Sequence, residues 1–120
     1  MAITASYCKR NDAVKLTKNT AAATFSIGLG DKPGEKVVIL VENNNKTAGC
    51  TATLQVLAGD YLANVYGTLS VDVAKETTAV IGPLETVRYK NDDGEIDCAC
   101  AVTGSDATLT NVKIGVIKLP

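Results

Sequence analysis

Histidine and tryptophan are both absent from this chain of 120 residues, and Phe25 is its only phenylalanine. Without histidine, the chain lacks the side chain that most often serves as a general base and as a metal ligand. A hydrolase would then need a lysine or carboxylate base beside a serine, threonine or cysteine, and the sequence presents no such arrangement. We therefore expect a protein that is not an enzyme and that has no catalytic, metal-binding or cofactor-binding residues.

Neither sign of charge dominates, since the chain has 12 basic and 13 acidic residues and a net charge of −1. Nucleic acid is therefore not an expected partner, because its phosphates select a strongly basic surface. The longest unbroken apolar run, residues 37–41, is far too short to span a membrane. The first residues contain no apolar stretch of the length that a signal peptide needs, so we expect a cytosol-like compartment.

With so few aromatic residues, the core must be built from Val, Ile, Leu, Ala and Cys, a set that suits stacked β-sheets. The clearest strand pattern is at residues 50–58, where apolar residues alternate with Thr51, Thr53 and Gln55. The spacing of the apolar runs predicts an all-β, single-domain sandwich of about eight strands, either jelly-roll or Ig-like. The predicted strands are residues 24–27, 37–41, 50–58, 69–73, 77–81, 84–90, 96–102 and 112–116.

Residues 1–22 are polar and follow no sustained period, although they hold four cations, Lys9, Arg10, Lys15 and Lys18. Either they form a first strand around residues 13–16, or they are an arm that orders only against a partner. The predicted organisation is thus an N-terminal arm or first strand at 1–22, followed by the sandwich domain at 23–120.

The sequence predicts that the strands are interrupted at two positions in the second half of the chain. Proline cannot donate to a β-ladder, so a break or a crossing between sheets is expected at Gly82-Pro83. The sequence Asn91-Asp92-Asp93-Gly94 predicts a hairpin turn, because Asp-Gly readily adopts the left-handed conformations of tight turns. It lacks the ligand spacing of a calcium loop and is flanked by predicted strands rather than helices.

The four cysteines are Cys8, Cys50, Cys98 and Cys100. Only one residue separates Cys98 from Cys100, whereas structural zinc usually takes cysteines with two residues between them. Residues two apart on a strand share a face, so these thiols are expected in the core as small apolar side chains. A disulfide from Cys50 to either is geometrically feasible, but nothing in the sequence indicates an oxidising compartment.

The longest predicted loop, residues 59–67, carries Tyr61 and Tyr66 in a protein with few aromatic residues. Tyrosine is enriched at protein interfaces, which makes both residues candidates for partner binding. The alternative is that both cap the open end of the sandwich, with their hydroxyl groups in water.

Several stretches together resemble small virion proteins of tailed bacteriophages, of the type encoded among head genes that decorates or cements the capsid. The resemblance covers roughly residues 24–120 and is a likeness of strand pattern rather than a catalytic signature. It is carried by VVILVEN (37–43), AGD (58–60), LSVDV (69–73), AVIGPLE (79–85) and VIKLP (116–120).

The resemblance implies a mechanical function, in which the protein binds the outer surface of the expanded capsid and stabilises it. The partner would be the major capsid protein, with the chain as a trimer or a monomer on the lattice. Residues 1–22 would then order on the capsid, which makes Lys9 and Arg10 candidates for partner binding. The location implied is the virion surface, and the host cytoplasm during assembly. The alternatives are a phage tail or baseplate component, and a carbohydrate- or surface-binding sandwich module.

Overall fold

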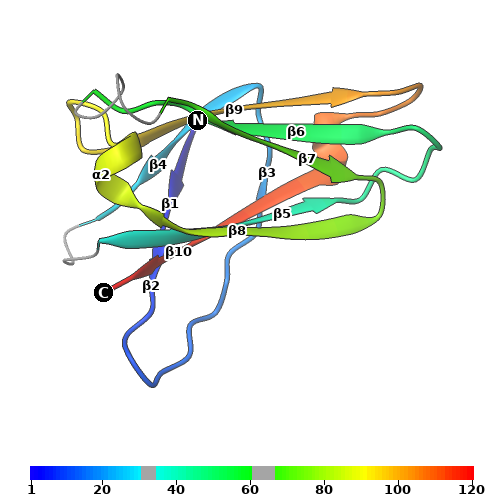
Figure 1. Cartoon of the computed structure of the whole chain (residues 1–120). Coiled ribbons are helices and arrows are strands. Elements are labelled where there is room, and N and C mark those ends of the chain that lie inside the picture. The colour runs from blue at the N-terminus through cyan, green and yellow to red at the C-terminus, as the bar shows by residue number, and fades with distance from the viewer. Residues whose placement is uncertain (31–34, 61–66) are drawn as a thin grey trace.

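The protein is a sandwich of two β-sheets, as seen in a computed structural model that describes residues 1–30, 35–60 and 67–120 (Figure 1). In the described residues, sheet A has the strand order β1-β4-β9-β6-β7, and sheet B has the order β2-β10-β5-β8, with β3 also paired to β10. The predicted all-β sandwich is therefore confirmed. The strands are β1 (Ala2–Thr4), β2 (Ser6–Tyr7), β3 (Asn19–Thr20), β4 (Thr24–Gly28), β5 (Lys36–Asn43), β6 (Thr51–Val56), β7 (Leu69–Ala74), β8 (Thr77–Glu85), β9 (Ile96–Thr103) and β10 (Val112–Leu119).

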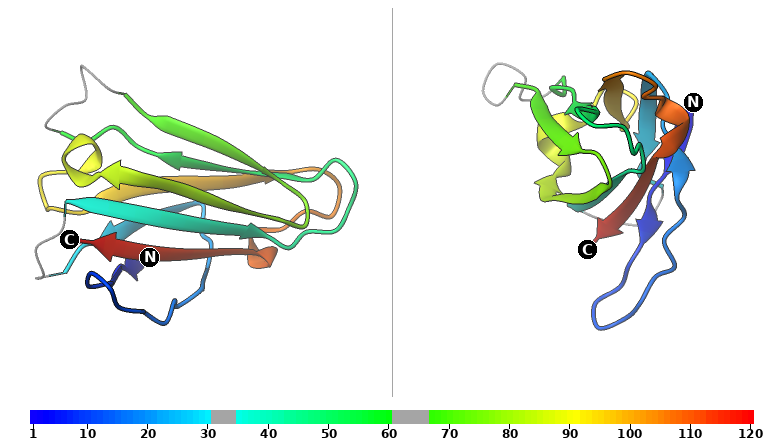
Figure 2. Two further views of the ribbon diagram at one scale, coloured as in Figure 1. Left: turned by 60° about the horizontal axis from the view of Figure 1, so that its bottom comes forward. Right: turned by 90° about the vertical axis from the view of Figure 1, so that its right-hand side faces the viewer.

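The core lies between the sheets and is formed by alternate residues of the long strands (Figure 2). On β5, Val37, Ile39 and Val41 are fully buried, while the residues between them are partly exposed. The same alternation on β6 buries Ala52, Leu54 and Val56, and it confirms the period of two that the sequence shows. Cys98 and Cys100 lie on the inward face of β9, and all four cysteines are free thiols.

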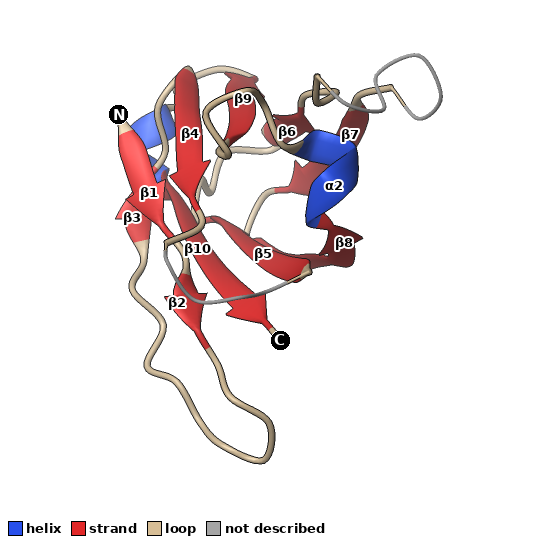
Figure 3. Cartoon of the chain, turned by 90° about the vertical axis from the view of Figure 1, so that its left-hand side faces the viewer, coloured by secondary structure: helices blue, strands red, loops and turns tan. Residues whose placement is uncertain are grey.

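The N-terminal segment belongs to both sheets. β1 pairs in parallel with β4 in sheet A, and β2 pairs in parallel with β10 in sheet B. Between them, Ala5 is the residue at which the chain changes sheets, and its N–H donates to the carbonyl of Gly28 at 2.9 Å. The strand predicted around residues 13–16 is wrong, because these residues lie in the long loop between β2 and β3 (Figure 3).

The predicted strand at residues 84–90 is correct only for Leu84 and Glu85, which end β8, and it is wrong from Thr86 onward. β8 continues through Gly82-Pro83 to Glu85, and the irregularity expected there is a register shift against β5 rather than a crossing. A short helix, α2 (Thr86–Tyr89), follows and is fixed by Thr86, whose N–H and hydroxyl both donate to the carbonyl of Glu35. The helix buries Tyr89 and leaves Val87 46% exposed, so the two residues do not share a face as a strand would require.

The turn at Asn91-Asp92-Asp93-Gly94 is confirmed, although it joins α2 rather than a strand to β9. The Gly94 N–H donates to the Asn91 carbonyl at 3.0 Å, and Gly94 has the positive φ of 77° that such a turn requires. The side-chain oxygen of Asn91 accepts the N–H groups of Asp93 and Glu95, which completes the turn. Among the described residues, no helix is long and apolar enough to cross a membrane.

Candidate interaction surface

Residues 8–18 form a loop that extends away from the sandwich (Figures 1 and 3). Lys9 and Arg10 lie in its first part, at the turn formed by Arg10 and Asn11. Both side chains are exposed. Asn11 has a positive φ of 56°, and the thiol of Cys8 lies 3.6 Å from the carbonyl oxygens of Lys9 and Asp12. These local contacts shape the turn that carries the two cations.

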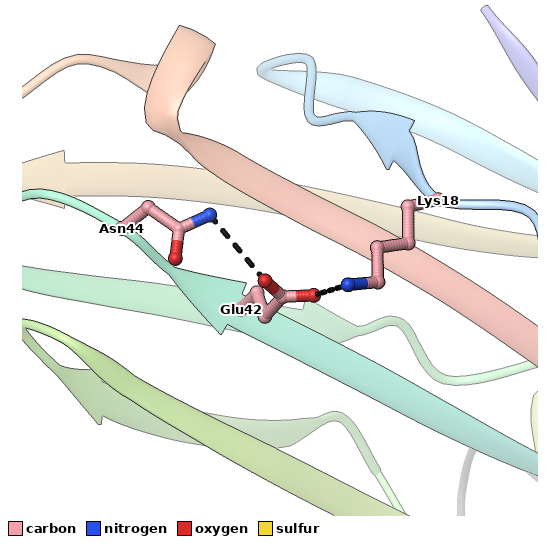
Figure 4. A network of polar contacts seen from close by, with 3 residues as sticks. All are labelled: Lys18, Glu42 and Asn44. Atoms are coloured by element: carbon pink, nitrogen blue, oxygen red, sulfur yellow. Dashed lines mark hydrogen bonds and ion pairs between the residues drawn. The ribbon is translucent and has the colours of Figure 1, made fainter.

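Both ends of the loop are fixed to sheet B. The Cys8 N–H donates to the carbonyl of Lys118 at 2.9 Å, and β3 pairs with β10 where the loop returns. Lys18 forms an ion pair of 2.6 Å with Glu42 on β5, and Glu42 also accepts the side-chain amide of Asn44 at 3.5 Å (Figure 4). The Lys18 hydrogen bond lowers the pKa of Glu42, so the ion pair is present at neutral pH and is lost as the pH falls through that lowered pKa.

Leu16 provides an apolar contact between the returning loop and sheet B. It lies over Gly115 of β10 so closely that a Cβ atom at residue 115 would be 2.7 Å from the Leu16 Cδ1 atom. Gly115 is consequently buried, although it occupies an outward-facing position of its strand. A glycine is needed there because any larger residue would displace Leu16.

The part of the loop between these anchors has an open backbone and a positive charge. Within the described residues, no backbone–backbone hydrogen bond joins residues 9–17 to a strand. Residues 8–18 contain four cations and one carboxylate, a net charge of +3, whereas the rest of the chain has eight cations and twelve carboxylates, a net charge of −4. The loop therefore offers a partner backbone groups that no strand pairs with, together with a local positive charge.

Next to the loop, the outer face of sheet B carries a band of apolar side chains, which we call the apolar stripe. Leu40 of β5 is opposite Val80 of β8 on one side and Gly115 of β10 on the other, and Val38 is opposite Ile117. Charged residues flank the stripe, with Glu42 opposite Lys113 at one end and Lys36 opposite Glu85 at the other. The stripe consists of Leu16, Val38, Leu40, Val80 and Ile117.

The outer face of sheet A has a different character, because its side chains are small and mostly polar. Thr53 and Asp72 are opposite each other on β6 and β7, and the threonine hydroxyl donates to the carboxylate at 2.7 Å. The remaining positions on this face include Thr24, Ser26, Thr51, Gln55, Ser70, Asp97, Ala99 and Ala101. Such a face gains less from burial than the apolar stripe, so sheet B presents the better docking surface.

The structure describes only two of the four residues that the sequence predicts as candidates for partner binding. Lys9 and Arg10 are exposed neighbours in the loop at residues 8–18, whereas Tyr61 and Tyr66 lie outside the described residues. The apolar stripe and the contact of Leu16 with Gly115 were not predicted. A signal for the latter was present in the sequence, since Gly115 interrupts a run in which Ile114, Val116 and Ile117 are β-branched.

A cleft of about 710 Å³ lies beside α2 and is lined in part by Glu35, Pro83, Glu85, Val87 and Lys90. Among the described residues of its lining, Thr86 alone carries a hydroxyl group, which donates to the carbonyl of Glu35 at 3.2 Å. No group of three Asp, Glu or Cys side chains within the described ranges is placed to hold a metal ion. The lining residues that the structure describes do not place a nucleophile beside a base.

Comparison of the chain with models of known protein families, with curated protein sequences and with solved structures gives no match. The basic loop at residues 8–18 and the apolar stripe are therefore the features from which a function can be argued. They lie side by side on one face, since Leu16 belongs to both.

The inward-facing cysteines lead to a prediction about thiol reactivity. Burial, with smaller effects of Asp97 and Cys100, raises the pKa of Cys98 to about 12, and burial also raises the pKa of Cys100. At about pH 8 only about one Cys98 thiol in 10,000 would be ionised, so a thiol reagent should modify the partly exposed Cys8 first. Mass spectrometry of the labelled native protein should show one modified residue, Cys8, and four after unfolding.

The raised pKa values of Cys98 and Cys100 also predict how the stability of the folded protein changes with pH. A thiol whose pKa is raised by folding stabilises the folded state below its unfolded pKa near 9, and this contribution is lost as the pH rises toward about 12. Unfolding midpoints should therefore fall in alkaline solution, and a Cys98→Ala variant should lose that part of the pH dependence. Rapid labelling of Cys98 in the native protein at neutral pH would contradict the buried position.

Proposed function

We propose that this protein is a non-enzymatic structural component of a phage head, which binds the outer surface of the expanded capsid and stabilises it. The basic loop at residues 8–18 and the apolar stripe of sheet B form the contact. The observation that carries the proposal is their arrangement, in which a cationic projection adjoins the one apolar outer face of a rigid sandwich.

The two parts of this surface would contribute in different ways. Burial of the stripe supplies free energy of binding at about 25 cal/mol per Å² of apolar area removed from water. Lys9 and Arg10 would guide the protein toward an acidic surface and fix its orientation there, which is what charged groups at the rim of an interface do. Binding would cost the loop little conformational entropy, because both of its ends are already fixed to sheet B.

The partner that fits is the major capsid protein, with an acidic and partly apolar site that is complete only in the expanded shell. Binding to one state of the shell stabilises that state by mass action. Repetition over a symmetric lattice would add avidity to contacts that are weak one by one. The protein would then be located on the virion surface, after assembly in the host cytoplasm.

Reversal of one loop charge tests the contact. An Arg10→Glu variant should bind expanded, undecorated heads about 10-fold more weakly than the wild type, because it places a carboxylate against an acidic surface. Occupancy is measured by co-sedimentation with expanded heads and with unexpanded proheads over a series of salt concentrations. Lys46→Glu is the matched control, since Lys46 is an exposed cation outside the loop, and it should bind within about twofold of the wild type.

A substitution in the stripe tests the apolar half of the contact. Val38→Lys should reduce occupancy on expanded heads without unfolding the protein, because the residue faces outward and is partly exposed. Equal binding of Arg10→Glu, Val38→Lys and the wild type would show that another surface is used. Wild-type protein that binds neither expanded heads nor proheads would contradict capsid decoration, and retention on a glycan surface would then favour a carbohydrate-binding module.

A further inference from the structure

Side chains, rather than a β-ladder, hold the returning half of the basic loop on sheet B. Within the described part of the chain, residues 9–17 form no backbone–backbone hydrogen bond with a strand. Leu16 instead packs on Gly115 of β10. Lys18 forms its ion pair of 2.6 Å with Glu42 of β5 (Figure 4). We call residues 9–18 the strap.

The exposure of successive residues shows which side of the strap faces the protein. Val14 and Leu16 are partly buried, whereas Ala13, Lys15 and Thr17 are exposed. Such a period of two is typical of an extended segment that lies on a surface with one of its faces. The strap therefore covers part of sheet B without the backbone hydrogen bonds that would make it a strand.

We propose that the strap is a movable cover, which opens by breaking the contacts of Leu16 and Lys18 while both sheets keep their ladders. Opening uncovers Gly115, so that this part of β10 joins the outer face beside Leu40. It also releases Lys18, which can then face an acidic partner together with the other cations of the loop. The use of this movement in docking rests on the proposed function, whereas the movement itself belongs to the free protein.

The charges around Glu42 make the ion pair easy to break. The Lys18 side chain is 56% exposed and that of Glu42 is 24% exposed, so water and salt compete with their contact. Lys113 of β10 is opposite Glu42 and stays beside it when Lys18 leaves. On its other side Glu42 is opposite Thr78 of β8, which carries no charge. Opening thus leaves the carboxylate exposed to water and next to a cation.

The apolar contact can be broken without disturbing the sheet. The three atoms nearest to a Cβ atom built at residue 115 all belong to the Leu16 side chain, at 2.7 to 2.8 Å. A methyl group at this position would therefore push Leu16 away. The ladder between β10 and β5 has no part in that clash, so Gly115→Ala acts on the strap.

Limited digestion of the full chain with trypsin measures the opening, because cleavage after Lys15 follows the population in which the strap is released. Glu42→Gln should raise the cleavage rate by about 2- to 5-fold, as loss of an exposed ion pair predicts. Gly115→Ala should raise it by about 10-fold or more. Glu85→Gln is the matched control, since it removes the carboxylate of the ion pair with Arg88, and it should stay within about 1.5-fold of the wild type.

Two further readouts separate opening of the strap from unfolding. In NMR spectra, the NOE between the Leu16 methyl groups and the Gly115 α-protons should be present in the wild type and lost in Gly115→Ala. Hydrogen exchange of β5 and β10 should be the same in the wild type and Glu42→Gln, because both ladders stay closed.

Exchange of the two charges tests the ion pair itself. Lys18→Glu and Glu42→Lys should each raise cleavage after Lys15, and the double variant should return it to within about twofold of the wild type. Equal cleavage of the wild type, Glu42→Gln and Gly115→Ala would overturn the proposal, as would faster exchange of β5 and β10 in step with cleavage. These results come from the free protein, so the strap and the binding to expanded heads can fail separately.

Discussion

Replacement of Asn45 by alanine should lower the free energy of unfolding by about 3 kcal/mol, with a fall in Tm of about 10 °C for a domain of this size. Asn45 is only 2% exposed, and its side chain joins three segments at one end of the sandwich. Its amide donates to the Asn43 side-chain oxygen at 2.9 Å and to the Thr108 carbonyl at 3.1 Å. Its oxygen accepts the Thr108 N–H at 3.0 Å and the Asn111 side-chain amide at 3.3 Å.

The cost arises because alanine leaves the Thr108 N–H without this partner and removes a donor from the buried side-chain oxygen of Asn43. The Thr108 carbonyl also loses one donor, although it keeps the Asn111 N–H at 3.2 Å. Each orphaned group of this kind costs about 1 to 3 kcal/mol. Asn43 extends the same network to the other sheet, since its side-chain amide donates to the Val73 carbonyl on β7 at 3.0 Å. The network therefore holds sheet B, sheet A and the segment before β10 together.

The adjacent residue provides a matched control for Asn45. Asn44 is exposed, and its side chain makes one contact of 3.5 Å with Glu42, while its backbone N–H bonds independently to Asn111. Asn44→Ala should change the free energy of unfolding by less than about 0.5 kcal/mol in the same urea or thermal titration. Equal stabilities of the two alanine variants would show that the buried network contributes nothing to folding.

The sequence predicts the sandwich well because burial on one face leaves a period-two pattern, which is clear at residues 50–58 and 96–102. It predicts β5 less completely, because residues 37–41 are all apolar and the run does not distinguish the core face from the outer face. The structure shows that Val38 and Leu40 face outward. The apolar stripe was therefore present in the sequence but could not be separated from the core.

Prediction from the local sequence pattern is wrong where contacts between distant segments decide the conformation. Val87 and Tyr89 alternate with polar residues as in a strand. However, the N–H and hydroxyl groups of Thr86 donate to the Glu35 carbonyl, and a helix begins at Thr86. β1 and β2 are too short to carry a period, and they form because β4 and β10 supply their ladder partners. The charge of Lys9 and Arg10 was visible in the sequence, but the course of the loop that carries them depends on anchors distant in the chain.

The two outer faces of the sandwich differ in a way that has a physical consequence. A protein that acted only as a monomer in water would gain from polar residues on both faces, as sheet A has. Sheet B keeps Val38, Leu40 and Val80 outward at some cost in solubility. The basic loop crosses the same face and covers Gly115 with Leu16, so it protects part of the stripe and leaves the rest open to a partner.

Gly59→Ala should destabilise the protein by about 2 to 3 kcal/mol, because the added methyl group has no space. A Cβ atom at residue 59 would lie 2.5 Å from the Lys90 carbonyl oxygen and 2.6 Å from the Tyr89 carbonyl carbon, both backbone atoms. The Gly59 N–H donates to the Arg88 carbonyl at 3.0 Å, so the chain after β6 cannot move away from α2 without losing that bond. Chemical denaturation measures the loss, and hydrogen exchange should show faster opening of α2.

Gly28→Ala is the control, because a Cβ atom at the end of β4 would meet its nearest neighbours at 3.9 Å. Alanine there should leave stability unchanged or raise it by up to about 1 kcal/mol, since it restricts the unfolded chain without creating a clash. The comparison separates the general effect of losing a glycine from the specific close approach of two segments. If both variants had the same stability, the contact between Gly59 and the end of α2 would not be as close as the structure has it. Other contacts would then have to hold α2 in its position against β9.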